Sequence, residues 1–139
     1  MTGTSDLTTL LKTMDPVLSD NEMVFCWLPG AGIEQCTSLS PVGCFIEKEG
    51  LSLIVERSIA EQYGIEFETT FRAITLNVHS SLQAVGLTAA VAGRLALHGI
   101  SANIVAAYHH DHIFVPTFDA ERALLALRTL QAEAARAIG

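Results

Sequence analysis

The stretch FRAITLNVHSSLQAVGLTAAVAGRLALHGISANIVAAYHHDHIFVP, residues 71–116, decides the fold class of this chain. Apolar and polar residues first alternate along it, which predicts a half-buried strand over residues 71–79. Apolar residues then recur at helical spacing, which predicts a helix over 87–98. Two further apolar runs, over 101–108 and 112–116, predict a pair of hairpin strands.

The regions on either side of this stretch extend the pattern. Asp119 precedes a helical stripe of leucines, so the second half has the order β-α-β-β-α, which is the ferredoxin-like order without its last strand. The first half has the order α-β-β-β-α, and its elements are predicted over 6–14, 23–28, 41–47, 51–55 and 58–63. We therefore expect an α+β chain of two ferredoxin-like βαββαβ sandwiches in tandem, over residues 1–65 and 66–139. Strands shared or exchanged between them would complete the sheets, and we expect such small sheets to pack together or to form a homodimer.

The amino-acid composition limits the classes of molecule that the chain is expected to bind. Half of the 139 residues are hydrophobic, the net charge is −7, and the eight basic residues are scattered along the chain. Nucleic acids and anionic membrane surfaces both favour a basic face, so neither is an expected partner. The chain has no apolar run of membrane-spanning length and its first residues lack the pattern of a signal peptide, so we expect a cytoplasmic protein.

The three cysteines do not predict a disulfide framework. Their number is odd and no CxxC spacing occurs, which also argues against a zinc site. Cys26 and Cys44 lie in the apolar runs MVFCWL and VGCFI. We expect both to be buried, reduced thiols.

The predicted topology brings two loops to one end of the second sheet. These are residues 79–86, after the first strand, and 109–112, in the hairpin before the third. The residues directly before Leu87 include no capping side chain, so the free N–H groups of the helix would favour an anion, and Gly86 would let a ligand approach the backbone. The alternative is that Ser80, Ser81 or water caps a slightly earlier helix start.

Histidines in the same two loops raise a second possibility. His110 and His112 would share one face of an extended segment, and His79 is the available third ligand for a zinc-like metal. The simpler interpretation is a polar hairpin turn in which Asp111 bonds its own backbone. No G-x-S-x-G elbow and no phosphate-binding glycine loop occurs, so we predict neither an enzyme nor a cofactor.

A longer motif carries a family resemblance. The segment VGLTAAVAGRLALHGISANIVAAYHHDHIFVP, residues 85–116, resembles a family of small stand-alone ACT-domain proteins. The pieces DLTTLLKTMDPVL, MVFCWL and EKEGLSLIVE resemble the same family, so the likeness spans nearly the whole chain. It implies tandem ACT-like units that bind effector amino acids at interfaces between units, near the loop after the first strand and the start of the first helix. Carried onto this chain, the implied ligand-binding residues are Ser80, Ser81, Val85, Gly86, Leu87, Thr88, Ala102 and Asn103.

These observations lead to one functional prediction and one alternative. We expect a regulatory or sensor module without catalytic activity, in which backbone N–H groups at Gly86–Thr88 bind the carboxylate of an amino acid and Asp111, or a backbone carbonyl, binds its ammonium group. ACT units usually regulate an attached catalytic domain, so the regulated protein here would be a separate chain. The alternative is a metal-binding protein or metal-dependent enzyme that uses His79, His110 and His112.

Overall fold

The computed structural model describes residues 6–137, which form two compact units. Unit 1 contains residues 6–19 and 72–137, and unit 2 contains residues 20–71. Unit 1 is therefore built from both ends of the chain, and unit 2 from the segment between them. The division predicted at residue 65 follows the order of the sequence and stays a prediction.

Unit 1 has the predicted ferredoxin-like order, and a strand from the other end of the chain completes it. Its elements are α1 (Leu7–Thr13), the first residues of β1 (Pro16–Leu28), β4 (Thr70–Leu76), α4 (Leu87–Leu97), β5 (Asn103–Ala106), β6 (Asp111–Pro116), a 3-10 turn (Thr117–Asp119) and α5 (Ala120–Ala137). The strands lie in the order β1-β4-β6-β5. Asn77 N donates to Asp15 O at 3.2 Å and Arg72 Nε donates to Ser19 O at 2.8 Å, so β1 and β4 run in opposite directions. The start of β1 thus fills the place of the strand that residues 72–137 lack.

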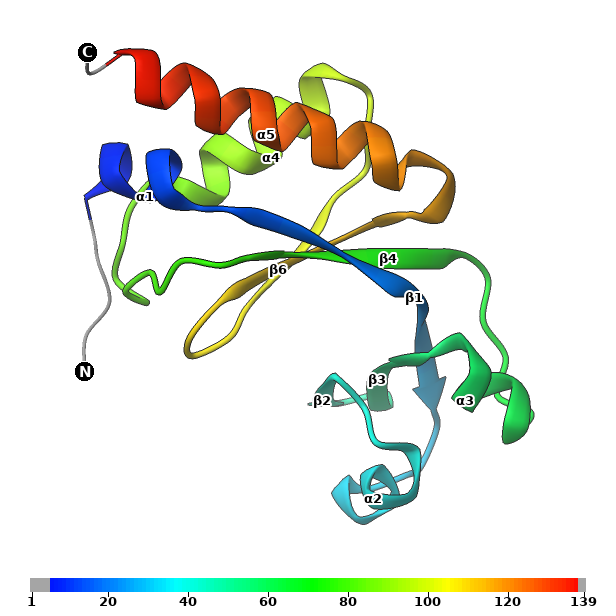
Figure 1. Cartoon of the computed structure of the whole chain (residues 1–139). Helices are drawn as coiled ribbons and strands as arrows, with labels where there is room; N and C mark the ends of the chain where they lie inside the picture. The colour runs from blue at the N-terminus through cyan, green and yellow to red at the C-terminus, as the bar shows by residue number, and fades with distance from the viewer. Residues whose placement is uncertain (1–5, 138–139) are drawn as a thin grey trace. The chain divides into compact units, whose positions relative to one another are not determined.

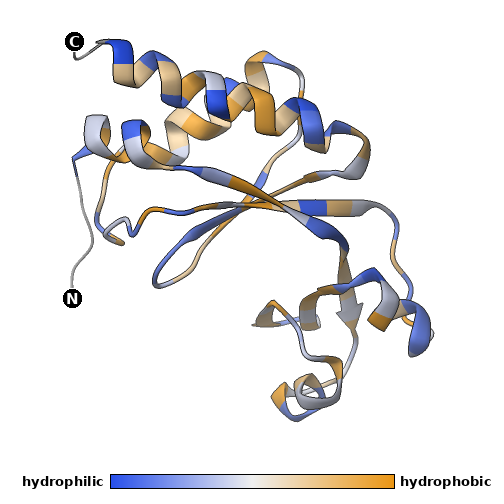
Figure 2. Ribbon diagram, viewed as in Figure 1, coloured by the Kyte–Doolittle hydropathy of each residue, from blue (hydrophilic) through white to orange (hydrophobic). Residues whose placement is uncertain are grey.

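The core of unit 1 lies between one face of this sheet and the helices α1, α4 and α5, which Figure 1 shows on that side. Ile74 and Leu76 of β4, and Ile113 and Val115 of β6, enter this core at alternate positions, as the period of a strand requires. Figure 2 shows apolar and polar bands alternating along α4 and α5. The residues most fully buried here are Leu10, Met14, Ile74, Leu76, Val91, Leu95, Ile113, Val115 and Leu127.

Helix α1, near the start of the described residues, packs against α5, near their end. The Asp6 carboxylate accepts from Thr9 N at 3.1 Å, which caps the start of α1 as its position in the sequence predicts. At the other end of α1, the Gln131 side chain on α5 donates to Lys12 O at 2.9 Å and accepts from Asp15 N at 3.2 Å. One amide side chain therefore satisfies two backbone groups where the helix ends.

Unit 2 repeats the same order with shorter helices. It contains the rest of β1, a 3-10 turn (Ile33–Gln35), α2 (Cys36–Leu39), β2 (Gly43–Glu47), β3 (Gly50–Glu56) and α3 (Arg57–Gln62). The strands lie in the order β2-β3-β1, and both neighbouring pairs are antiparallel. The buried core consists of Val24, Cys26, Leu39, Leu51, Leu53, Val55 and Ala60.

Three sequence expectations for the first half need correction. The strand predicted over 23–28 begins at Pro16, because its polar first residues pair with the distant β4 and leave no apolar pattern. The turns over 33–39 were not predicted, since they bury only Leu39. Cys44 is half-buried and only Cys26 is buried. Among residues 6–137, no helix is long and apolar enough to cross a membrane.

Candidate functional site

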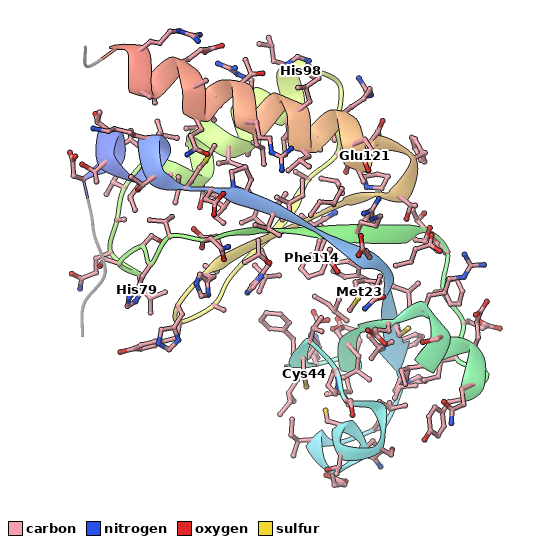
Figure 3. The ribbon with its side chains drawn as sticks, in the orientation of Figure 1. Met23, Cys44, His79, His98, Phe114 and Glu121 are labelled. Carbon is pink, nitrogen blue, oxygen red and sulfur yellow. The ribbon has the colours of Figure 1, made fainter. Side chains whose placement is uncertain are left out.

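The two loops expected to meet do lie together in unit 1. Residues 77–86 follow β4, and the β5–β6 hairpin turns at residues 107–110. Ser80 Oγ donates to Asp111 Oδ2 at 3.4 Å, and the His79 ring centroid lies 5.2 Å from that of His109. Figure 3 marks His79 near this hairpin. The prediction from topology is therefore confirmed, because β4 and β6 are neighbouring strands and the end of β4 lies beside the start of β6 at one end of the sheet.

These loops and the start of α4 enclose a hollow of about 100 Å³. Nine residues line it: Ser80, Ser81, Leu82, Ala84, Gly86, Leu87, Thr88, Ala106 and Asp111. Six of them are among the residues predicted to bind a ligand: Ser80, Ser81, Gly86, Leu87, Thr88 and Asp111. Leu82 and Ala84 were not predicted, although they belong to the loop over residues 79–86 that the sequence indicated. Ala106, which pairs with Asp111 across the hairpin, was not predicted either.

Three of the predicted site residues do not line the hollow. Val85 is 82% exposed. Ala102 packs against the core of unit 1, and Asn103 is an exposed residue of β5 opposite Phe114. The contribution of these three residues to ligand binding stays a prediction.

The start of α4 has no side-chain cap. Gly86 is the N-cap residue, with φ of +101°, and no side chain accepts a hydrogen bond from the first turn. Ser81 Oγ accepts from Gln83 N at 3.1 Å, and Ser80 donates to Asp111. The alternative in which one of these serines caps the helix is therefore wrong. The first N–H groups of an 11-residue helix, with their partial positive charge, lie at the hollow.

Asp111 is the one charged residue among those lining the hollow, and only 8% of it is exposed. It stands at the first position of β6, and its backbone is held by the pairing with Ala106. A buried carboxylate needs hydrogen-bond donors or a cation beside it. Within residues 6–137, the one side chain that donates to its carboxylate is Ser80, whose hydroxyl forms a long hydrogen bond of 3.4 Å. The hollow thus combines helix N–H groups with a carboxylate, a pairing that suits a ligand carrying both charges.

The neighbouring histidines do not form a metal centre. His79 contacts His109 and Tyr108, whereas His112 Nδ1 shares a hydrogen bond with Thr75 Oγ1 at 2.9 Å. Over residues 6–137, no three His, Cys, Asp or Glu side chains are placed to hold a metal ion. Burial lowers the pKa of His112, and nearby His110 lowers it further, while Asp111 acts in the opposite direction. The alternative that relied on His79, His110 and His112 receives no support from this geometry.

Comparison with known proteins identifies the class. An ACT domain family model matches residues 2–72, and a second ACT domain model matches residues 66–129. The chain belongs to the ACT domain family, which consists of ligand-binding regulatory domains.

Solved structures agree with this assignment. A protein of unknown function from Vibrio cholerae, described as a possible transport protein, is 49% identical over 90% of this chain and 95% of its own, with a TM-score of 0.81. The regulatory subunit of aspartate kinase from Thermus thermophilus shares the fold at 12% identity, over 83% of this chain and 95% of its own, with a TM-score of 0.59. E. coli aspartokinase III, in complex with aspartate and ADP, has 15% identity over 83% of this chain and 32% of its own, with a TM-score of 0.61. None of the curated protein sequences matches the chain.

Proposed function

We propose that this chain binds a free amino acid in the hollow of unit 1 and acts as a regulatory or sensor module without catalytic activity of its own. One observation carries the proposal: a carboxylate that is 8% exposed and an uncapped helix start line the same hollow. A free amino acid at neutral pH carries the complementary pair of charges on adjacent atoms.

The helix start would bind the ligand carboxylate. The backbone N–H groups of the first turn, at Leu87 and Thr88, have no side-chain acceptor, and the helix dipole favours a negative charge there. Gly86 presents no side chain toward the hollow that it lines. The hydroxyls of Ser81 and Thr88 line the same space and can add hydrogen bonds.

Asp111 would bind the ligand ammonium group. An ion pair at a buried position is strong only when both charges are also hydrogen-bonded, and the Ser80 hydroxyl supplies one such bond to Asp111. A hydroxy acid or keto acid of the same shape would leave Asp111 unpaired, so we expect the site to reject both.

The small volume of the hollow is relevant to the oligomeric state that we propose. A space of about 100 Å³ corresponds to roughly three water molecules in the liquid, at about 30 Å³ each, which suits the backbone of an amino acid but not a large side chain. A second copy of the chain would complete the side-chain pocket in a homodimer. We expect the protein to be cytoplasmic.

The direct test is a thermal-shift screen of the twenty amino acids, followed by calorimetric titration of any that stabilise the protein. A ligand present at 100 times its Kd adds about 2.7 kcal/mol to the free energy of unfolding. If no amino acid raises the melting temperature, the proposal is wrong.

The residue-level test compares two buried aspartates. Asp111→Asn keeps the shape but removes the charge, and we expect it to weaken binding of the amino acid at least tenfold, or about 1.4 kcal/mol. Asp119→Asn is the matched control, because Asp119 is also 8% exposed but lies before α5, where its carboxylate accepts from Arg122 at 2.8 Å. The control should lower stability and leave the affinity unchanged. Equal affinity in both variants would exclude Asp111 from the site.

A further inference from the structure

Two cysteines of unit 2 lie in contact. Cys36 is the first residue of α2 and Cys44 is on β2, and their sulfur atoms are 3.2 Å apart. Both thiols are free, half-buried and packed against the core of unit 2. Figure 3 marks Cys44 in this region.

The backbone between them already returns on itself. Ser40 ends α2 in the left-handed conformation, with φ of +44°, and its N–H donates to Cys36 O at 3.2 Å. Val42 N then donates to Ile54 O at 2.8 Å, which fixes the start of β2. The two sulfurs stand about 1.2 Å beyond the length of a disulfide bond of about 2.05 Å, a gap that side-chain rotation can close.

The strand register separates the third cysteine, Cys26, from Cys44. Cys26 on β1 and Cys44 on β2 both lie opposite Leu53 on the strand between them, β3. Two strand spacings separate them by about 10 Å, which is beyond the Cα separation of about 7 Å that a disulfide tolerates.

We propose that Cys36 and Cys44 are a redox modification site that closes to an intramolecular disulfide on reaction with a low-molecular-weight disulfide. One thiol loses its proton and its thiolate attacks a sulfur of the small disulfide, which releases one small thiolate and forms a mixed disulfide. The second cysteine thiolate attacks the protein sulfur of that mixed disulfide and releases the other small thiolate. The two cysteines lose two electrons and two protons, and the small disulfide gains them as two thiols.

Closure would fasten the edge of the unit 2 sheet. β2 is the outer strand in the order β2-β3-β1, and within the unit it pairs with β3. A disulfide would tie this strand to α2 and restrict the unfolded chain. We expect it to raise the melting temperature by roughly 5–10 °C.

The reaction should be slow at neutral pH. The hydrogen bond with Cys44, burial and the charge of Glu34 together raise the pKa of Cys36. The thiolate is the reactive form, so closure should speed up as the pH rises from about 7 to 9.

The experiment treats the reduced full-length protein with hydroxyethyl disulfide at pH 8.5, blocks the remaining thiols with iodoacetamide and digests the unfolded product after glutamate. Cleavage after Glu22, Glu34 and Glu47 places Cys26 in peptide 23–34 and the other two cysteines in peptide 35–47. We expect peptide 35–47 to lose the mass of two hydrogen atoms and to carry no acetamide group, while peptide 23–34 is alkylated.

Two variants sharpen the test. Cys26→Ala should close as the unaltered protein does, whereas Cys36→Ser should stop at a mixed disulfide on Cys44. The proposal is overturned if peptide 35–47 carries two acetamide groups or two hydroxyethyl adducts after prolonged exposure. Bridges between molecules, or through Cys26, would overturn it equally.

Discussion

Units 1 and 2 share one order of elements and differ in what stands at the start of the crossover helix. In unit 1, α4 has 11 residues and its first turn has no side-chain cap. In unit 2, the crossover is a three-residue turn followed by the four-residue α2. There, Gly32 N donates to the Gln35 side chain at 2.8 Å, so a side chain of the protein itself accepts a hydrogen bond from the backbone at this start.

The comparison shows that the start of the crossover helix can be capped by the chain in one copy of the fold and left uncapped in the other. An uncapped helix start loses about 1 kcal/mol of stability relative to a capped one, and a bound anion can recover it. The helices of unit 1 are long enough to form a large core that tolerates this loss, whereas α2 and α3 of unit 2 have four and six residues. The chain thus leaves its backbone donors free in the unit with the larger core.

Core substitutions should produce the largest difference between the units. Leu95 on α4 is fully buried, and Leu95→Ala should lower the free energy of unfolding by about 2–5 kcal/mol. Leu39 on α2 lies in the smaller core of unit 2, so Leu39→Ala should cost about 2 kcal/mol, at the lower end of that range. Urea denaturation of both variants provides the measurement. A greater loss for Leu39→Ala would refute this ranking of the two cores.

Alanine substitution of the glycines at the two helix starts should produce the next largest difference in stability between the units. Gly86 has φ of +101°, and an added Cβ would lie 3.0 Å from Leu7 Cδ2, so Gly86→Ala should cost about 1–2 kcal/mol. Gly32 has φ of −108°, and its added Cβ would meet only the flexible carboxylate of Glu34. Gly32→Ala should therefore cost less than about 0.5 kcal/mol.

The control for backbone strain is Gly93, in the middle of α4. An added Cβ there meets nothing within 4 Å, so Gly93→Ala should stabilise the protein by about 0.5–1 kcal/mol. Thermal melts of the three alanine variants compare them directly. If Gly86→Ala were as stable as Gly93→Ala, the left-handed conformation would carry no strain. Because Gly86 has this structural role, Asp111→Asn is the better test of ligand binding.

Mild acid should affect unit 1 alone, since all five histidines lie within residues 79–112. The pKa of His112 is lowered from its ordinary 6.5, so the unfolded chain takes up a proton first and stability falls as the pH drops below about 6.5. His112→Gln should lessen the fall in melting temperature between pH 7 and 5. This effect should be smaller than the change in melting temperature that Gly86→Ala causes. His98→Gln, at an exposed position after α4, is the control and should behave like the unaltered protein. An identical pH profile for His112→Gln would contradict the assignment.

The smallest expected effect concerns an ion pair between α4 and α5. Arg94 Nη2 lies 2.6 Å from Glu133 Oε1, and the hydrogen bond from Arg94 holds the pKa of Glu133 below its ordinary 4.5. The ion pair therefore stabilises the protein above pH 4.5, and this stabilisation disappears as the pH falls through the lowered pKa of Glu133. Glu133→Gln should lower the melting temperature slightly at pH 7 and not at pH 2. Because the Glu133 side chain is 45% exposed, 1 M salt should also reduce the difference.

Local periodicity was sufficient to predict most of unit 1. The alternation around Ile74 and the helical spacing from Leu87 to Leu95 depend on a single buried face, which a sequence displays directly. The meeting of Ser80 and Asp111 followed from the topology. The early start of β1 could not be found in this way, because residues 16–19 pair with β4, and Arg72 of that strand lies 53 positions after Ser19. Likewise, the exposure of Val85 depends on which way the loop turns, and sequence spacing does not record that.

The strand at the start of β1 also has a consequence for synthesis on the ribosome. Residues 6–19 are synthesised before their partners, because β4 follows after 50 further residues and Gln131 lies 116 residues after Asp15, with which it forms a hydrogen bond. Such long-range pairings raise contact order and slow folding. Unit 2 lies between them in the sequence and can form while the nascent chain is still growing. Folding of unit 1 must then wait until α5 has been synthesised, and residues 6–19 stay without their partners until that point.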